Sequence, residues 1–161
     1  MEPLTTIDID SVLFNNSVTK RDFIGTFPSC IVPYSTRKCY SFIANVDEHD
    51  EKGKHWVSFF AFRQGKKSGP ANSLAFFDSF GRKYDDETLP EHFTDIASSF
   101  DHVIYSRTRV QGWESVACGY FCVQFLYFMS LGLDYSSFLN EYSTNFEQND
   151  EIVMDFYKSI L

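Results

Sequence analysis

The feature that most constrains the fold is a long apolar run in the last third of the chain. Residues 115–131, SVACGYFCVQFLYFMSL, are too long and too apolar for a strand, and Gly132 follows as a stop signal. The run therefore predicts a buried helix, around which the rest of the fold must be arranged.

The remaining patterns predict strands in the middle of the chain and helices towards its ends. Strands are predicted over residues 38–46, 55–62, 73–80 and 101–110, the second and third forming a hairpin with a long tip. Residues 23–34 contain two prolines and indicate an extended loop with an edge strand, and 47–54 a polar turn. Further helices are predicted over 6–16, 86–98, 134–144 and 149–160. We expect one α+β domain, residues 1–161, with a central mixed sheet packed on the buried helix.

Composition excludes several classes of function. The 161 residues carry a net charge of −8, which argues against a broad nucleic-acid surface, because phosphate binding needs clustered Lys and Arg. No signal peptide opens the chain and no apolar run approaches the ~18 residues of a membrane span. Four cysteines are too few for a disulfide scaffold, so we expect a reducing, intracellular setting.

Cys118 lies where small and polar residues give way to the apolar run, and two interpretations of it are open. A lone cysteine in an apolar helix is commonly a small core residue. A helix N-terminus, however, carries about half a positive charge and unsatisfied N–H groups, which favour a thiolate nucleophile. Gly119 beside it leaves room for a substrate backbone. Cys122, one turn later, is expected to be a packed hydrophobe rather than half of a metal pair.

A thiol nucleophile needs a base, a group that orients the base, and donors for the oxyanion. His55 starts a strand directly after a polar turn, where its ring can stand at a sheet edge. Asp78 ends the neighbouring strand in FFDSFGR, where it can receive the second imidazole N–H. Gln111 can donate its side-chain NH2 to the oxyanion. Each of these residues also has a purely structural interpretation, so the case rests on the combination.

Taken together, GKHW, FFDSFGR and QGWESVACGYFC resemble the adenovirus maturation protease family (adenain) and its relatives in virophages and Maverick-type transposons. The wider clan includes the SUMO-deconjugating proteases. The family order implies a base, an orienting carboxylate, an oxyanion donor and a nucleophile at His55, Asp78, Gln111 and Cys118. Trp56 matches the indole that follows the family's histidine, and FIGTF at 23–27 resembles the family's N-terminal segment.

Spacing within the clan favours the maturation branch. Seven positions separate Gln111 from Cys118, as in adenain, and SVACG resembles adenain's Ser-Ala-Ala-Cys-Gly. The SUMO proteases usually have six positions and an Asp before the cysteine, where this chain has Ala117. Asp78 departs from this trend, because the shorter carboxylate is that of the deconjugating branch.

The resemblance implies a papain-like cysteine endopeptidase that cuts viral structural precursors after small residues such as Gly. Its setting would be virion maturation, in the virion and the infected host cell. Trp56, Trp113 and Gly119 are expected to bind substrate in a narrow slot, with structural packing an equal alternative for Trp113. No metal or other cofactor is implied.

The expected partners differ from those of adenain. The acidic charge puts DNA activation in doubt. Residues 100–109 hold no cysteine for a disulfide-linked activating peptide, so an activating peptide would bind non-covalently. By family precedent the protein is expected to be a monomer.

Two rival functions stay open. A protease that removes ubiquitin-like modifiers would share the narrow slot for glycine. A non-catalytic descendant would only bind a glycine-containing tail, although the filled catalytic positions argue against it. Alkylation of Cys118 near pH 6 separates the enzymes from the binding module.

Overall fold

The computed structural model describes residues 1–46, 55–65 and 69–161. Within these residues one five-stranded sheet has the order β1-β2-β3-β4-β5. Its strands are β1 (Phe23–Phe27), β2 (Cys39–Asn45), β3 (Trp56–Phe62), β4 (Ser73–Phe77) and β5 (His102–Ile104). The three inner strands are antiparallel, whereas each edge strand runs parallel to its neighbour. The sheet is therefore mixed, as the sequence predicts.

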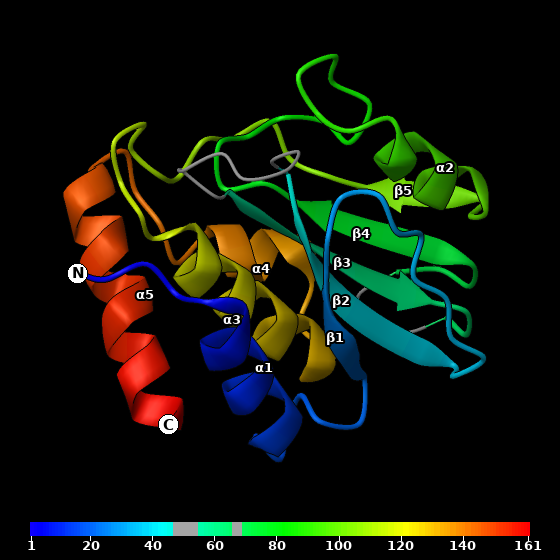
Figure 1. Ribbon diagram of the computed structural model, residues 1–161, viewed down its shortest axis with the longest axis horizontal. Helices are drawn as coiled ribbons and strands as arrows, with labels where there is room; N and C mark the ends of the chain where they lie inside the picture. The colour runs from blue at the N-terminus through cyan, green and yellow to red at the C-terminus, as the bar shows by residue number, and fades with distance from the viewer. Residues whose placement is uncertain (47–54, 66–68) are drawn as a thin grey trace.

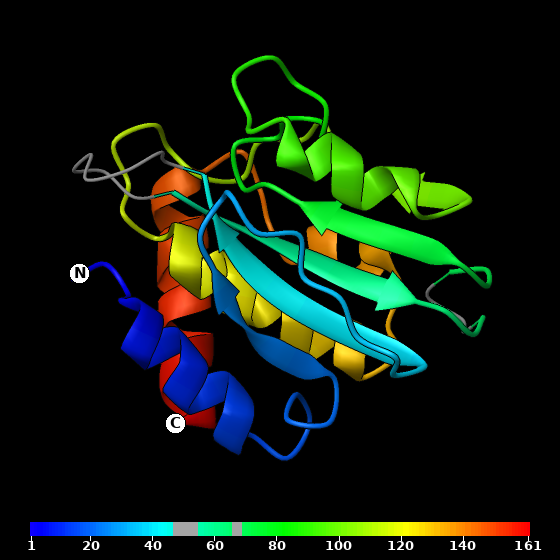
Figure 2. The same ribbon diagram turned by 45° about the vertical axis from the view of Figure 1, so that its right-hand side comes forward.

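Helices cover both faces of this sheet (Figure 1). The described helices are α1 (Thr6–Asn15), α2 (His92–Ser98), α3 (Cys118–Ser130), α4 (Tyr135–Leu139) and α5 (Phe146–Ile160). Helix α3 packs directly on β3, with α1, α4 and α5 grouped around it, while α2 lies over the other face (Figure 2). No helix in the described part of the chain is both long and apolar enough to cross a membrane.

The aromatic run of β3 explains why both faces need a cover. Side chains alternate along a strand. Phe60 and Phe62 therefore join the core under α3, whereas Val57 and Phe59 join the core under α2. All seven residues of β3 are buried, as expected for the central strand of a sheet covered on both sides.

The antiparallel pairing of β3 with β4 brings two candidate site residues together at one end of the sheet. Ser58 lies opposite Phe77, so the residues just before β3 and just after β4 meet at one end. These residues are His55 and Asp78. The predicted polar turn at 47–54, which precedes His55, lies outside the described residues.

The buried helix is confirmed, but it begins at Cys118 rather than at Ser115. The Ser115 backbone N–H donates to the Gly112 carbonyl at 3.0 Å, and the Ala117 N–H donates to the Ser115 hydroxyl at 3.1 Å. A serine side chain that binds nearby backbone competes with helix formation. The helix is thus shortened at its start, which places Cys118 in its first turn.

The predicted strand at 101–110 is correct only for residues 102–104. Beyond them the chain leaves the sheet and runs beside the turn that follows β4. The N–H groups of Val110 and Gln111 both donate to the Ser79 carbonyl, at 3.0 and 3.2 Å. Gly81 permits this approach, because a Cβ there would lie 2.7 Å from the Arg107 carbonyl oxygen and its φ is +76°.

The other predicted helices exist with different limits. Helix α2 starts at His92 rather than 86, because a turn closed by Asp86 and Thr88 and then Pro90 precede it. Helix α4 is confined to Tyr135–Leu139, and α5 begins earlier than predicted, at Phe146. Its N-cap is Asn145, whose side chain accepts from the Gln148 N–H at 3.1 Å.

Candidate active site

His55 and Asp78 form a buried pair at the end of the sheet. The His55 Nε2 lies 2.7 Å from the Asp78 Oδ1, and both side chains are almost fully shielded from solvent. A carboxylate can only accept, so the ring nitrogen donates. This bond fixes the imidazole tautomer and leaves Nδ1 for the other side of the ring.

Both carboxylate oxygens of Asp78 accept hydrogen bonds. Its Oδ1 also accepts from the Phe80 backbone N–H at 2.9 Å, and its Oδ2 accepts from the Arg82 Nε at 2.6 Å. Burial by itself would raise the pKa of Asp78, but the hydrogen bond and charge of His55, helped by Arg82 and the Phe80 N–H, hold that pKa below its usual value. Asp78 is therefore an ionised carboxylate with a fixed orientation.

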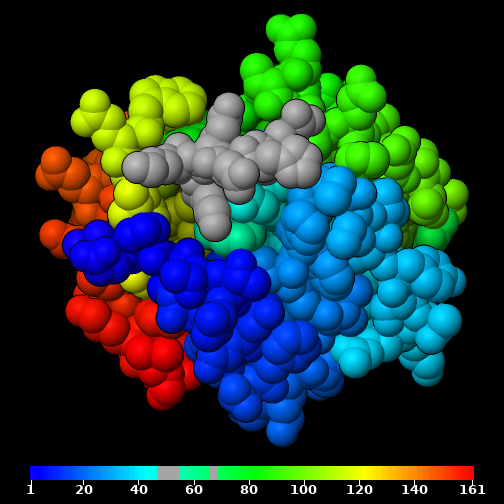
Figure 3. Space-filling model, in the orientation of Figure 1, coloured from blue at the N-terminus to red at the C-terminus, as the bar shows by residue number. Residues whose placement is uncertain are grey.

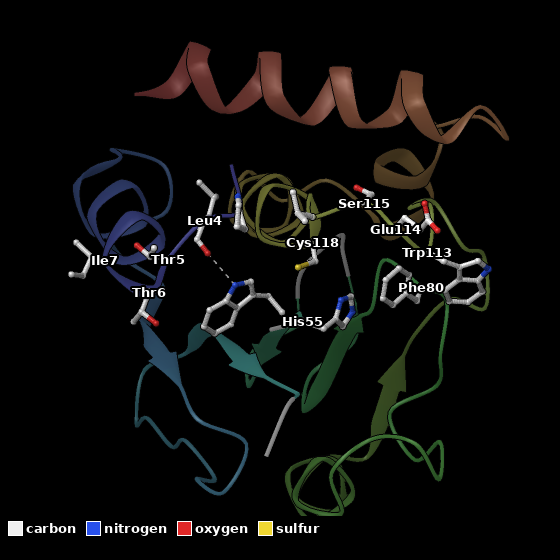
Figure 4. A pocket seen from close by; sticks show the side chains of 13 residues that line it. Leu4, Thr5, Thr6, Ile7, His55, Phe80, Trp113, Glu114, Ser115 and Cys118 are labelled. Carbon is white, nitrogen blue, oxygen red and sulfur yellow. Dashed lines mark hydrogen bonds between the residues drawn. The ribbon is translucent and has the colours of Figure 1, made fainter. Parts of the chain in front are cut away.

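Cys118 faces the other side of the His55 ring (Figure 4). Burial is the largest effect on the pKa of His55 and lowers it. Hydrogen bonds to Asp78 and Cys118, together with the charges of both groups, outweigh burial and raise the pKa of His55 to about 9. The imidazole is thus protonated at neutral pH, and a positive charge stands between a carboxylate and a thiol in the first turn of α3.

Gln111 is fully buried beside this pair, not exposed as an isolated glutamine would be. Its Oε1 accepts from the Ser79 hydroxyl at 2.5 Å, and its Nε2 donates to the Ser115 carbonyl at 2.8 Å. These bonds tie the side chain to the residue after Asp78 and to the turn before Cys118. Among the described contacts Nε2 makes only this one hydrogen bond, but Gln111 itself is not among the residues that line the cleft beside His55 and Cys118.

A cleft of about 700 Å³ opens onto His55 and Cys118. One wall is the N-terminal segment, residues 3–7, and the other is the loop at 113–116 with Phe80 (Figure 4). Figure 3 shows the blue N-terminal residues beside the yellow loop residues on one face of the molecule. The lining is mostly apolar.

The two tryptophans take different places in this cleft. Trp56 is buried, and its Nε1 donates to the Leu4 carbonyl at 3.3 Å, so it anchors the N-terminal wall. Trp113 is 66% exposed at the opposite rim, under the Arg109 guanidinium at 4.2 Å. Both line the cleft.

Gly119 is not among the residues that line the cleft. A Cβ at this position would lie 3.1 Å from the Leu4 Cβ and 3.4 Å from the Trp56 Cδ1. The structure therefore uses Gly119 to let the N-terminal wall pack on α3, and it does not bring this residue to the place where a substrate would lie.

Sequence reasoning missed three contributors. Phe80 stacks on His55, with ring centroids 4.3 Å apart and planes 11° apart, and contacts Trp113 at 5.0 Å. Arg82 binds Asp78 from four residues later, a spacing visible in DSFGR. The N-terminal wall at Leu4 gives no local signal, because its contact with Trp56 spans 52 residues.

Cys122 packs in the interior. Its Sγ donates to the Trp56 carbonyl at 3.3 Å, and burial raises its pKa well above the usual value. Among the described residues no group of three His, Cys, Asp or Glu side chains could hold a metal ion.

The mixed sheet, the buried helix with Cys118 in its first turn and the His55–Asp78 pair define the class of fold. It is the α+β fold of the papain-like cysteine proteases, as the sequence predicts.

Several solved structures share this fold, including the two that follow. The pS273R protease of ASFV superposes with a TM-score of 0.63 at 15% identity, over 94% of this chain and 66% of its own. ChlaDub1 of Chlamydia trachomatis superposes with a TM-score of 0.54 at 14% identity, over 76% of this chain and 60% of its own. No family model matches the sequence, and no curated protein matches it. The resemblance read from the motifs thus holds at the level of the fold.

Proposed function

We propose that the protein is a cysteine endopeptidase. The observation that carries this proposal is the placement of Cys118, in the first turn of a buried helix and facing a histidine whose other nitrogen binds a buried carboxylate at 2.7 Å. This is the nucleophile, base and orienting group that thiol catalysis needs, and the nucleophile and the base both line one cleft.

In the proposed first step, the Cys118 thiolate attacks the carbonyl carbon of the scissile peptide bond and a carbon–sulfur bond forms. The Gln111 amide and backbone N–H groups at the start of α3 bind the oxyanion that results. Protonated His55 gives its proton to the departing amine, the carbon–nitrogen bond breaks, and a thioester is left on Cys118.

In the second step, neutral His55 takes a proton from water as the water attacks the thioester. The carbon–sulfur bond breaks, the acid product leaves, and the thiolate–imidazolium pair is restored. Asp78 keeps the ring oriented throughout and stabilises its charged form, supported by Arg82.

The substrates proposed are viral structural precursors, cut after small residues such as Gly during virion maturation. The motif order and the seven-residue spacing of Gln111 and Cys118 support this assignment. So does the presence of Trp56 and Trp113 in the cleft that opens onto Cys118. The same proposal places the protein in virions and infected cells, as a monomer that needs no cofactor and takes any activating peptide non-covalently.

Removal of ubiquitin-like modifiers is the second candidate, and Asp78 in place of Glu is the observation that favours it. Both functions require cleavage after glycine. They differ in whether the bond lies inside a precursor or after a folded modifier.

Cleavage-site mapping tests the proposal. The purified protein is incubated with a peptide library that includes the C-terminal tails of ubiquitin-like proteins, beside a Cys118→Ala control. Cuts at internal Gly-X bonds that are absent in the control are the expected result. Cuts confined to di-glycine tails would move the protein to the second candidate, and no cutting by the wild-type protein would contradict both.

A further inference from the structure

The loop between Gln111 and Cys118 is supported from behind by the C-terminal helix. Two consecutive residues near the start of α5 bind the two ends of this loop. The Asn149 Nδ2 donates to the Val110 carbonyl at 2.9 Å, and the Asp150 Oδ2 accepts from the Ser115 hydroxyl at 2.7 Å. The loop that carries the proposed oxyanion donor is thus bound at both ends by α5.

Ser115 is the point where these supports converge. Its hydroxyl donates to Asp150 and accepts from the Ala117 N–H, while its carbonyl accepts from the Gln111 Nε2. One residue therefore sets the position of the Gln111 amide and of the backbone that enters α3 at Cys118. Both proposed sources of oxyanion donors depend on where Ser115 is held.

Asn149 holds the other end of this loop, at Val110. It is fully buried, and besides binding Val110 it donates to the Ser143 carbonyl at 2.8 Å and accepts from the Ser143 N–H at 3.0 Å. The Arg109 guanidinium adds a third contact, lying over Phe146 of α5 at 4.3 Å.

The surroundings of the Asp150 carboxylate are unfavourable for the stability of the fold. Its Oδ1 is buried and has no hydrogen-bond partner, and Glu147 lies near enough to repel its charge. An unsatisfied buried oxygen lowers the stability of the fold. The carboxylate is therefore explained by what its other oxygen does, which is to fix the Ser115 hydroxyl.

We propose that Asp150 is a positioning residue for the oxyanion hole, acting through Ser115. The inference rests on the proposed function and deepens it. It identifies the Asp150–Ser115 hydrogen bond as the interaction that fixes the positions of Gln111 and of the start of α3 relative to each other. Neither Asp150 nor Ser115 is required to touch the scissile bond.

Steady-state kinetics with a fluorogenic peptide ending in Gly-Gly tests the inference. Asp150→Ala and Ser115→Ala should each lower kcat about tenfold or more with KM changed less than about twofold, since misplacing catalytic groups from a distance costs up to about 10²-fold. The double variant should be no slower than the slower single variant, because both remove one interaction. Asp150→Asn keeps an oxygen acceptor for the Ser115 hydroxyl and should recover most of the activity.

A matching peptide aldehyde separates positioning from general damage. Its adduct with Cys118 places an oxygen in the oxyanion hole, so its affinity should fall in parallel with kcat. Asp155→Ala, an exposed acid on the same helix, is the matched control and should leave both values unchanged.

Unchanged kcat in Asp150→Ala would overturn the inference while leaving the proposed function intact. A drop in kcat accompanied by an equal rise in KM and a lower Tm would also overturn it, since that pattern marks structural damage. Wild-type protein that turns over neither this peptide nor the mapped library would overturn the proposed function, and the inference with it.

Discussion

The first and second turns of α3 hold the same chemical group in two surroundings. Cys118, in the first turn, lines the cleft and faces His55. Cys122, four residues later, is completely buried and donates to the Trp56 carbonyl. Burial raises the pKa of Cys122 well above its usual value, whereas a protonated imidazole stands beside Cys118. One turn of helix therefore separates a proposed nucleophile from a core residue.

Substitution of each cysteine by alanine should give the largest difference in activity between the two positions. Cys118→Ala should abolish peptide turnover and leave the fold intact, because the attacking atom is lost. Cys122→Ala should keep turnover and lower the free energy of unfolding by roughly 1–3 kcal/mol through lost packing. Turnover assays and denaturant unfolding on both variants check this, and equal activity in the two variants would contradict the assignment.

Two glutamines extend the comparison. Gln111→Ala should lower kcat by roughly 10²–10³, the usual effect of losing one oxyanion donor. Gln124 is also buried, but in the interior of α3, where its Oε1 accepts from the Tyr142 hydroxyl. Gln124→Ala should therefore affect stability and not kcat. A loss of less than tenfold in Gln111→Ala would mean that other donors form the hole.

The pH profile of kcat/KM reports on His55. Its pKa is raised from 6.5 to about 9, so activity should persist through neutral pH and fall about tenfold per unit above pH 9. The stability of the fold should change with pH in the same direction as the activity. Protonated His55 stabilises the fold fully below about pH 6.5, and this contribution is lost as the pH rises through about 9. A basic limb near pH 6.5 would instead mean that Asp78 and Cys118 do not stabilise the imidazolium.

Arg82 should have a smaller effect, since it acts through Asp78. Arg82→Gln removes a charge that lowers the pKa of Asp78 and one bond that orients it. We expect activity to fall about tenfold and the acid limb of the pH profile to move to higher pH. Arg82→Lys should restore the acid limb more than the rate, because a lysine supplies the charge without the same geometry. An unmoved acid limb in Arg82→Gln would show that Arg82 has no part in holding Asp78 ionised.

Gly119→Ala should have the smallest effect. The new methyl group would press on Leu4 at 3.1 Å, while alanine is the better helix former by about 1 kcal/mol. Overpacking typically costs about 1–3 kcal/mol, so the net loss of stability should be roughly 1 kcal/mol. KM should change more than kcat, because Leu4 belongs to the cleft wall. Adding Leu4→Ala should relieve the stability loss, and a double variant that is no better would rule out this contact as its cause.

The sequence predicted the fold where the pattern was local. The aromatic alternation of 55–62 and the apolar run after Cys118 depend only on which faces are buried, and both elements formed as expected. The start of α3 was predicted too early, because the hydrogen bonds of Ser115 compete with the helix. The strand at 101–110 was predicted too long, because the chain turns there to bind Ser79.

The four candidate catalytic residues could be predicted from the sequence, but the residues that surround and support them could not. His55, Asp78, Gln111 and Cys118 are each marked by a motif and by their order along the chain. The supports around them come from distant segments. Leu4 binds Trp56 across 52 positions, and Asp150 binds Ser115 across 35. Such contacts leave no periodic signal in a single sequence, so only the folded chain reveals them.

Alkylation by iodoacetamide at pH 6, followed residue by residue with peptide mass spectrometry, tests the central claim most directly. Cys30, exposed in a loop, serves as the internal reference for an ordinary thiol, and Cys122 as the reference for a buried one. Cys118 should be modified much faster than Cys30, because it lies in the first turn of α3 and faces protonated His55, while Cys122 stays unmodified. Modification of Cys118 no faster than that of Cys30 would contradict the role of Cys118 as the nucleophile on which the proposed enzyme depends.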